Sequence, residues 1–447
     1  MKYTFPNDFM WGVATSAAQI EGGANQGGRG PSIWDAFSHL PGNIKNGDLP
    51  DVACDSYHLY EKDIQLMKEL GVKSYRFSFS WSRIIPEGWG KVNPEGIAYY
   101  KALIARLKEN NIVPNATMYH WDLPYKLQLM GGFGNREIVR WFTDYARVLL
   151  ENFGDDVDLW VTFNEPIALF VGMAKGFFAP GLKNEKYARQ CLHNLLVCHG
   201  ETVKLFRQMN LNNAKIGIVV DIWKHYPARE GNPQDLAMTV QANEIDGYGM
   251  FLNPIFLGEY TPVYLEYLRK HDMMPVMEKN DFETISQKLD FYGLNFYNGL
   301  FDHADAAKAR EKSGVGGNYQ DRPQSHPEKL LDVLYMLVEK YKVDIPIYIT
   351  ENGLPHMGVA GDMKDYLEDN DRIAYIKNVL AVLYEALQQG INVRGYYVWT
   401  LMDNFEWSAG YAPRYGLYYT DFNTLERIPK RSACWYQRVI RENGFEI

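Results

Sequence analysis

The chain has 447 residues and a net charge of −9, from 46 lysines and arginines against 55 aspartates and glutamates. This balance argues against nucleic acid as a partner, because such binding depends on clustered lysine and arginine facing phosphates. With 46% hydrophobic residues the chain can bury a sizeable core. Its length fits two or three domains, or one large α/β barrel with long loops.

The four cysteines, Cys54, Cys191, Cys198 and Cys434, form no CxxC pair and no metal-type spacing. So few cysteines in a long chain are typical of a reducing compartment. Residues 2–8 interrupt any signal-peptide core with Pro, Asn and Asp, and no run approaches the ~18 apolar residues of a membrane span. We therefore expect a cytoplasmic protein without membrane contact, and a homo-oligomer remains an open alternative.

Strand-like apolar runs alternate with helical patterns along the chain, with no linker between them. The runs cover 9–14, 74–80, 113–120, 159–164, 215–220, 290–297, 346–350 and 393–400. Apolar stripes of helical period lie between them, such as 57–70 before Gly71 and 373–387 before Gly390. This alternation predicts a single (β/α)8 TIM barrel, an α/β domain spanning residues 1–447. A doubly wound sheet is the structural alternative.

Three segments, 21–51, 298–327 and 399–421, are too long for plain connections and are polar or aromatic-rich. Long loops in a compact domain tend to be functional or disordered. In a βα barrel the loops that follow the strands build the active-site face. We expect these three segments to form a cleft on that face.

Two glutamates stand where predicted strands end. Glu165 lies in Thr-Phe-Asn-Glu-Pro (162–166) and Glu351 in Ile-Thr-Glu-Asn-Gly (349–353), so a chain breaker follows each closely. A carboxylate in that place lies on the catalytic face of a barrel. Two carboxylates facing each other across a bond are what cleavage of an acetal requires. A single such glutamate is more often a surface acid; the pair, with the residues below, favours catalysis.

Other polar and aromatic side chains fall at or near the same strand ends, more of them than packing requires. They are Gln19, Arg76, His120, Trp121, Asn164, Asn295, Tyr297, Trp399, Glu406 and Trp407. Each alone has a structural explanation, but together they describe a pocket suited to a polyhydroxylated ligand. No phosphate-binding glycine loop and no convincing metal spacing is present, so we expect neither a cofactor nor a metal ion.

These motifs make the chain resemble glycoside hydrolase family 1, the retaining β-glucosidase family, over nearly its whole length. Besides the two glutamate motifs, the matching segments are Phe-Met-Trp-Gly-Val-Ala-Thr (9–15), Tyr-Arg-Phe-Ser (75–78), Tyr-His-Trp-Asp-Leu-Pro (119–124) and Leu-Met-Asp-Asn-Phe-Glu-Trp (401–407). Asn-Glu-Pro alone is weak, but the ordered series is specific. The resemblance implies a (β/α)8 barrel that hydrolyses β-glucosides without a cofactor.

The resemblance also implies roles for the site residues. Glu165 resembles the general acid/base and Glu351 the nucleophile, with Arg76 and Tyr297 as the pair that keeps the nucleophile ionised. The expected sugar contacts are Gln19, His120, Trp121, Asn164, Asn295, Trp399, Glu406 and Trp407. Among these, Asn164 resembles the residue that binds the 2-hydroxyl and Trp399 the stacking platform.

Four positions depart from the commonest family pattern: Ile167, Asp221, Tyr415 and Phe133. Ile167 and Asp221 fall where the family binds the aglycone, so they bear on the leaving group and not on the catalytic pair. Asp221 could accept hydrogen bonds from an acceptor sugar or pair with a nearby base, and both alternatives stay open.

The expected substrates are β-glucosides and short β-linked oligosaccharides such as cellobiose, with β-galactosides and β-fucosides as further candidates. The alternatives are a 6-phospho-β-glycosidase, a transglycosylating relative and a non-catalytic sugar-binding relative. The last is disfavoured because such proteins usually lose one of the two glutamates, and both are present here.

Overall fold

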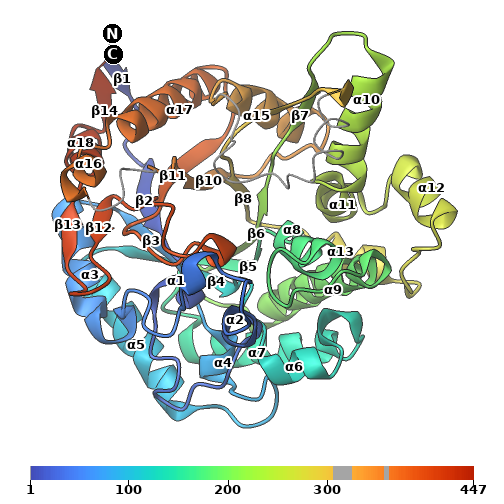
Figure 1. Cartoon of the computed structure of the whole chain (residues 1–447), viewed down its shortest axis with the longest axis horizontal. Coiled ribbons are helices and arrows are strands. Elements are labelled where there is room, and N and C mark those ends of the chain that lie inside the picture. The colour runs from blue at the N-terminus through green and yellow to red at the C-terminus, as the bar shows by residue number, and fades with distance from the viewer. Residues whose placement is uncertain (1, 306–324, 357–361, 447) are drawn as a thin grey trace.

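A computed structural model of the chain describes residues 2–305, 325–356 and 362–446. Eight parallel strands close into a barrel in the order β10-β11-β2-β3-β4-β5-β6-β8. They are β2 (Met10–Ala14), β3 (Ser74–Ser78), β4 (Val113–Tyr119), β5 (Leu159–Asn164), β6 (Lys215–Asp221), β8 (Phe291–Asn295), β10 (Ile347–Asn352) and β11 (Val393–Trp399). Figure 1 shows the strands at the centre of a ring of helices. The predicted (β/α)8 barrel is confirmed, and the doubly wound sheet is not formed.

Helices follow every barrel strand. The longer ones are α3 (Ser56–Leu70), α5 (Pro94–Glu109), α7 (Ile138–Phe153), α9 (Glu185–Met209), α10 (Pro233–Val240), α12 (Pro262–Lys270), α15 (Lys329–Glu339), α17 (Asn370–Gln388) and α18 (Arg431–Glu442). Shorter ones are α1 (Ala17–Ile20), α2 (Ile33–Ser38), α4 (Trp81–Ile84), α6 (Tyr125–Leu129), α8 (Ile167–Phe170), α11 (Gly249–Leu252), α13 (Asp281–Ile285) and α16 (Met363–Leu367). Single 3₁₀ or π turns are η1 (Lys45–Gly47), η2 (Gly132–Gly134), η3 (Val171–Lys175), η4 (Gln241–Ile245), η5 (Asn253–Leu257) and η7 (Trp407–Ala409).

The helices form where the apolar period predicts them. In α3 the stripe buries Ile64, Met67 and Leu70 against the barrel, and Gly71 ends the helix with φ of 81°. That left-handed conformation suits glycine, which has no Cβ to clash. Helix α7 buries a wider face that carries Trp141, Tyr145 and Leu149. The main core therefore lies between the barrel and its helices.

The barrel interior is a second, smaller core. Val161, Val219, Phe291 and Tyr397 pack there with other inward-facing side chains. Tyr397 fits only because its neighbour on β2 is Gly12, where a Cβ would lie 2.3 Å from the Tyr397 ring. This filled lumen confines any ligand to the ends of the barrel.

Short strand pairs lie outside the barrel. β1 (Lys2–Thr4) pairs with β14 (Gly444–Glu446), which holds the two ends of the described chain side by side (Figure 1). β7 (His225–Pro227) pairs with β9 (Leu300–Asp302), and β12 (Tyr418–Thr420) with β13 (Arg427–Pro429).

The predicted loops carry short elements rather than plain coil. Segment 21–51 contains α2 and η1, and segment 399–421 contains η7 and β12. Of segment 298–327, residues 306–324 lie outside the described residues. Strand β10 runs past its predicted end at 350, because Glu351 and Asn352 stay paired with the neighbouring strands. Glu351 is thus a strand residue, and the chain turns only after it.

Candidate active site

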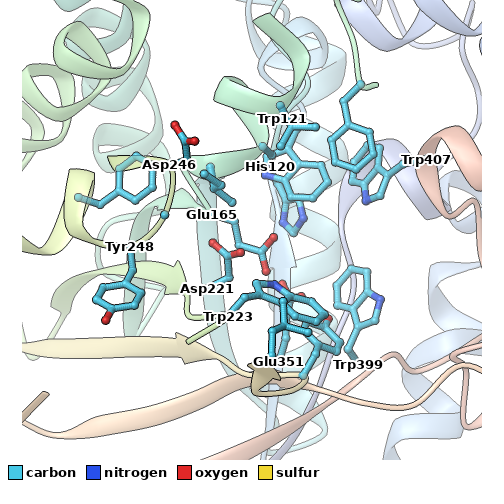
Figure 2. A pocket seen from close by; sticks show the side chains of 18 of the residues that line it. His120, Trp121, Glu165, Asp221, Trp223, Asp246, Tyr248, Glu351, Trp399 and Trp407 are labelled. Carbon is cyan, nitrogen blue, oxygen red and sulfur yellow. The ribbon is translucent and has the colours of Figure 1, made fainter. Parts of the chain in front are cut away.

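A cavity of about 380 Å³ opens at the carboxyl ends of the barrel strands (Figure 2). Eight of the twelve predicted site residues line it: His120, Trp121, Glu165, Tyr297, Glu351, Trp399, Glu406 and Trp407. The other four, Gln19, Arg76, Asn164 and Asn295, lie behind this lining and are hydrogen-bonded to it. The structure therefore brings all twelve together at one end of the barrel, as a cavity of the size that small ligands use.

The carboxylate of Glu351 is held on both oxygens. Arg76, which faces it from β3, donates from Nη1 to Oε1 at 2.6 Å, and the Tyr297 hydroxyl donates to Oε2 at 2.8 Å. The Arg76 guanidinium is fully buried, and Glu351 is nearly so. A buried guanidinium requires a negative partner. This contact therefore favours the ionised form of Glu351.

Glu165 has a different environment. Its Oε1 accepts a hydrogen bond of 2.6 Å from Asn295 Nδ2, and no arginine or lysine pairs with it among the described residues. The Thr350 hydroxyl, 2.7 Å from Asn295 Oδ1, turns the amide nitrogen toward Glu165. The backbone of Glu165 has φ of 43°, which is uncommon for a residue with a Cβ. Such strained residues cluster at functional sites.

These environments separate the acidities of the two glutamates. Burial raises the pKa of Glu165 well above its usual range, and the charges of Asp221 and Glu351 raise it further. Burial also raises the pKa of Glu351, but the Arg76 charge and hydrogen bonds from Arg76 and Tyr297 oppose that effect. The proton therefore stays on Glu165 to higher pH than on Glu351. Two carboxyls pushed apart in this way are typical of an acid and a nucleophile.

Asn164 links several site residues. Its Oδ1 accepts from Arg76 Nη2 at 2.5 Å, and its Nδ2 lies 3.1 Å from His120 Nε2. Its backbone carbonyl accepts from Trp121 Nε1 at 2.9 Å. Burial, then the Arg76 charge, lowers the pKa of His120 well below its usual range, so the imidazole is neutral. Since its Nε2 accepts from Asn164, the proton is assigned to Nδ1.

Glu406, in the loop after β11, also lines the cavity. Its Oε1 accepts from Trp399 Nε1 at 3.3 Å and its Oε2 from Gln19 Nε2 at 3.4 Å. Gln19 is itself fixed by a 2.8 Å bond to the carbonyl of Phe405. A carboxylate oxygen can accept more than one hydrogen bond, so Glu406 can also accept from sugar hydroxyls.

Aromatic rings form one side of the cavity. The rings of Trp121 and Trp407 lie 4.5 Å apart, and His120 stacks at 6.0 Å on both Trp399 and Trp407. Aromatic faces of this kind can pack against the apolar face of a pyranose ring.

The far half of the cavity was largely missed by sequence reasoning. It is lined by Ile167, Val171, Asp221, Trp223, His225, Asp246, Tyr248, Phe251 and Leu300. Ile167 and Asp221 stand out in the sequence as departures from the family pattern, and Trp223, two residues after the end of β6, could have been found by the same rule as the other site residues. Asp246 and Tyr248 come from the helical segment after β6, where no strand-end signal points to them.

The four residues that depart from the family pattern do not all lie in the cavity. Ile167, Asp221 and Tyr415 line the cavity, whereas Phe133 packs against Tyr119 and Phe163 outside it.

In the described residues, no group of three or more His, Cys, Asp or Glu side chains is arranged to hold a metal ion. None of the helices in that part of the chain combines the length and apolar character needed to cross a bilayer.

The comparisons with known proteins agree with this geometry. The family model described as "Glycosyl hydrolase family 1" matches residues 1–445. The chain is 44% identical to the 1,4-beta-D-glucan glucohydrolase of Thermotoga neapolitana, over 98% of this chain and 99% of that one. It is 43% identical to beta-glucosidase A of Thermotoga maritima, over 99% of both chains.

A solved structure of the family 1 β-glucosidase from Thermotoga maritima is similar over 100% of both chains, with a TM-score of 0.91 and 43% identity. The same T. maritima enzyme in complex with deoxynojirimycin also gives a TM-score of 0.91, at 43% identity, over 99% of this chain and 100% of that one. The match extends over the barrel and over the loops that build the cavity. The chain belongs to glycosyl hydrolase family 1.

Proposed function

We propose that the chain is a retaining, exo-acting β-glucosidase that hydrolyses terminal β-D-glucosyl residues through a covalent glycosyl-enzyme. The observation that carries this is the pair of buried carboxyls in unlike environments, Glu351 against Arg76 and Tyr297, and Glu165 beside Asn295. Relatives at 43–44% identity are named beta-glucosidase or glucan glucohydrolase. The first support is the geometry of the site, and the second is the similarity of the sequence to these relatives.

In the first step Glu351 is the nucleophile and Glu165 the acid. A Glu351 carboxylate oxygen attacks the anomeric carbon, and the bond to the glycosidic oxygen breaks as that oxygen takes the proton of Glu165. The high proton affinity of Glu165 at neutral pH supplies the acid, and Arg76 and Tyr297 keep the nucleophile ionised.

In the second step Glu165 acts as a base. Having lost its proton, it takes one from a water molecule, whose oxygen attacks the anomeric carbon and releases Glu351. Two inversions at one carbon restore the β configuration. If a sugar hydroxyl replaces water, the same step yields transglycosylation, so the balance between the two depends on what occupies the far half of the cavity.

The glucose unit occupies the side of the cavity formed by Trp399, Glu406 and Trp407. Glu406 accepts hydrogen bonds from the 4- and 6-hydroxyls, while His120 and Asn164 bind hydroxyls nearer the reacting carbon. Gln19 and Asn295 hold their neighbours in place and offer further polar atoms. β-Galactosides and β-fucosides are secondary substrates. A galactoside differs from a glucoside only at position 4 and a fucoside at positions 4 and 6, so the other sugar contacts stay the same.

Residues 1–447 act as one catalytic domain, and cellobiose and short β-linked oligosaccharides are its natural class of substrate. We place the protein in the cytoplasm. The support is its cysteine chemistry, since Cys54, Cys191, Cys198 and Cys434 all occur as free thiols.

The first expected outcome is retention of configuration. The carboxyl groups of Glu165 and Glu351 should lie roughly 5–5.5 Å apart, the separation of retaining enzymes. An NMR time course with an aryl β-glucoside should show β-glucose before mutarotation. α-Glucose as the first product would reject the mechanism, and no hydrolysis at all would favour the non-catalytic alternative.

The second outcome separates the two roles. Glu351→Ala should abolish turnover of every substrate, because no glycosyl-enzyme can form. Glu165→Ala should lower turnover of poor leaving groups most, by about 10²–10⁴-fold, since only these need a proton. With an activated aryl glucoside it should give a burst followed by slow release, and azide should accelerate that release. Azide rescue of Glu351→Ala with retention would reverse the assignment.

The third outcome concerns phosphorylated sugars. The residues that line the cavity include no lysine or arginine in the described part of the chain. Arg414 is the cation closest in sequence after Glu406 that could bind a phosphate. It donates instead to the carbonyl of Thr420 and packs on Phe422. A phosphate at the sugar 6-position would therefore meet the Glu406 carboxylate without a compensating cation.

Two unit charges of like sign 4 Å apart repel by about 4 kcal/mol at an effective dielectric of about 20. That corresponds to roughly a thousandfold in binding. We expect kcat/KM for 4-nitrophenyl β-glucoside to exceed that for its 6-phosphate by a wide margin. A preference for the phosphate would overturn both the role of Glu406 and the choice of neutral glucosides.

A further inference from the structure

Asp221 lies beside Glu165 by the construction of the barrel. Asp221 is the last residue of β6, and Glu165 directly follows the neighbouring strand β5, where its N–H donates to the carbonyl of Val219 at 2.9 Å. Val219 faces the barrel interior, and Asp221, two residues on, faces the same side. On the other flank Asp221 is in register with Asn295, the residue that donates to Glu165 Oε1.

The Asp221 carboxyl group is buried and only partly satisfied. Its side chain is 7% exposed, and Trp223 donates a hydrogen bond to it. Its Oδ1 is buried with no hydrogen-bond partner among the described residues. Figure 2 shows this carboxyl pointing into the same space as Glu165, above Glu351. A buried acceptor left in this state is unusual and calls for a functional explanation.

The Arg76 guanidinium at this end of the barrel is already engaged. Arg76, from β3, is paired with Glu351 and Asn164. The other ionisable groups that face the space come from several elements: His120 after β4, Tyr297 after β8, and Glu351 in β10. Glu406, Asp246 and His225 line the same cavity, and His225 Nδ1 is 2.9 Å from Asp302. None of the described residues therefore neutralises Asp221.

We infer that Asp221 is a positioning residue of the reaction: its negative charge, held beside Glu165 without a cation, extends toward higher pH the range in which Glu165 keeps its proton. This rests on the proposed role of Glu165 as the acid. Of the two alternatives left open by the sequence, pairing with a base does not occur among the described residues, where Asp221 forms no ion pair.

The direction of the effect follows from the order in which the carboxyls ionise. Glu351 ionises first, because Arg76 favours its charged form. Burial raises the pKa of Asp221 to about 7, with the Glu351 charge acting in the same direction. Glu165 then loses its proton last, against two negative charges, and its pKa is raised well above the usual range. Because the groups interact, they titrate as a coupled set.

The test is the pH dependence of kcat/KM for phenyl β-glucoside, whose poor leaving group requires the acid. The basic limb of that profile reports the ionisation of the acid in the free enzyme. Asp221→Asn removes one charge with almost no change of shape, so the basic limb should move to lower pH. Asp221→Glu keeps the charge, and its basic limb should remain near that of the wild type.

A matched control is available in the same cavity. Asp246 accepts hydrogen bonds from Arg189 and Gln241, so its charge already has a partner. The charges that raise the pKa of Glu165 most are those of Asp221 and Glu351. Asp246→Asn should therefore leave the basic limb at the wild-type position, whatever its effect on KM.

Three results would overturn the inference: an unmoved basic limb in Asp221→Asn, an equal movement in Asp221→Glu, or an equal movement in Asp246→Asn. A higher KM with an unmoved limb would make Asp221 an aglycone contact only. If Asp221→Asn does not fold, as judged by circular dichroism, Asp221→Ser is tested in its place, because it removes the same charge. Failure of the wild type to hydrolyse phenyl β-glucoside would reject the proposed function instead, so the two failures are distinguishable.

Discussion

The buried contact between Arg76 and Glu351 is the interaction on which the rest of the site depends. The two residues are 275 positions apart and meet only because β3 and β10 belong to one closed barrel. A guanidinium buried without a partner costs several kcal/mol, so the barrel must close with Glu351 and Asn164 in place. The same contact keeps one carboxylate charged in a cavity that otherwise favours neutral acids.

The second constraint is that one cavity must hold a protonated carboxyl group, which acts as the acid, and an ionised one, which acts as the nucleophile. Burial acts on Glu165 and Glu351 alike, and the difference between them comes from what each one touches. Arg76 and Tyr297 serve Glu351, whereas Glu165 has an amide and a neighbouring acid. The strand order decides this, because Arg76 on β3 reaches Glu351 while Asp221 on β6 lies beside Glu165. The segment at the end of β8 serves both glutamates, through Tyr297 and Asn295. Topology and acidity are therefore linked.

Much of this could be predicted from the sequence, for physical reasons. The eight strands stand out because β-prone apolar runs end in chain breakers, and Glu165 and His120 could be located because such ends share one face. Asp246 and Tyr248 could not be located in this way. They reach the cavity from the helical segment after β6, whose path depends on tertiary packing. The hydrogen-bond partner of each carboxyl group could not be predicted from the residue pattern, because it depends on the register of the strands. Only the family resemblance implied Arg76 and Tyr297 as partners of Glu351.

Burying unpaired acids beside one another affects the stability of the whole domain. Glu165 and Asp221 hold protons in the folded state at pH values where the unfolded chain has already released them. The folded state then binds more protons than the unfolded one, so the free energy of unfolding falls as pH rises from the unfolded pKa, about 4, toward the folded value. A descendant that lost these acids would gain stability at neutral pH. Stability at neutral pH and the acid chemistry of the site therefore place opposite demands on these two positions.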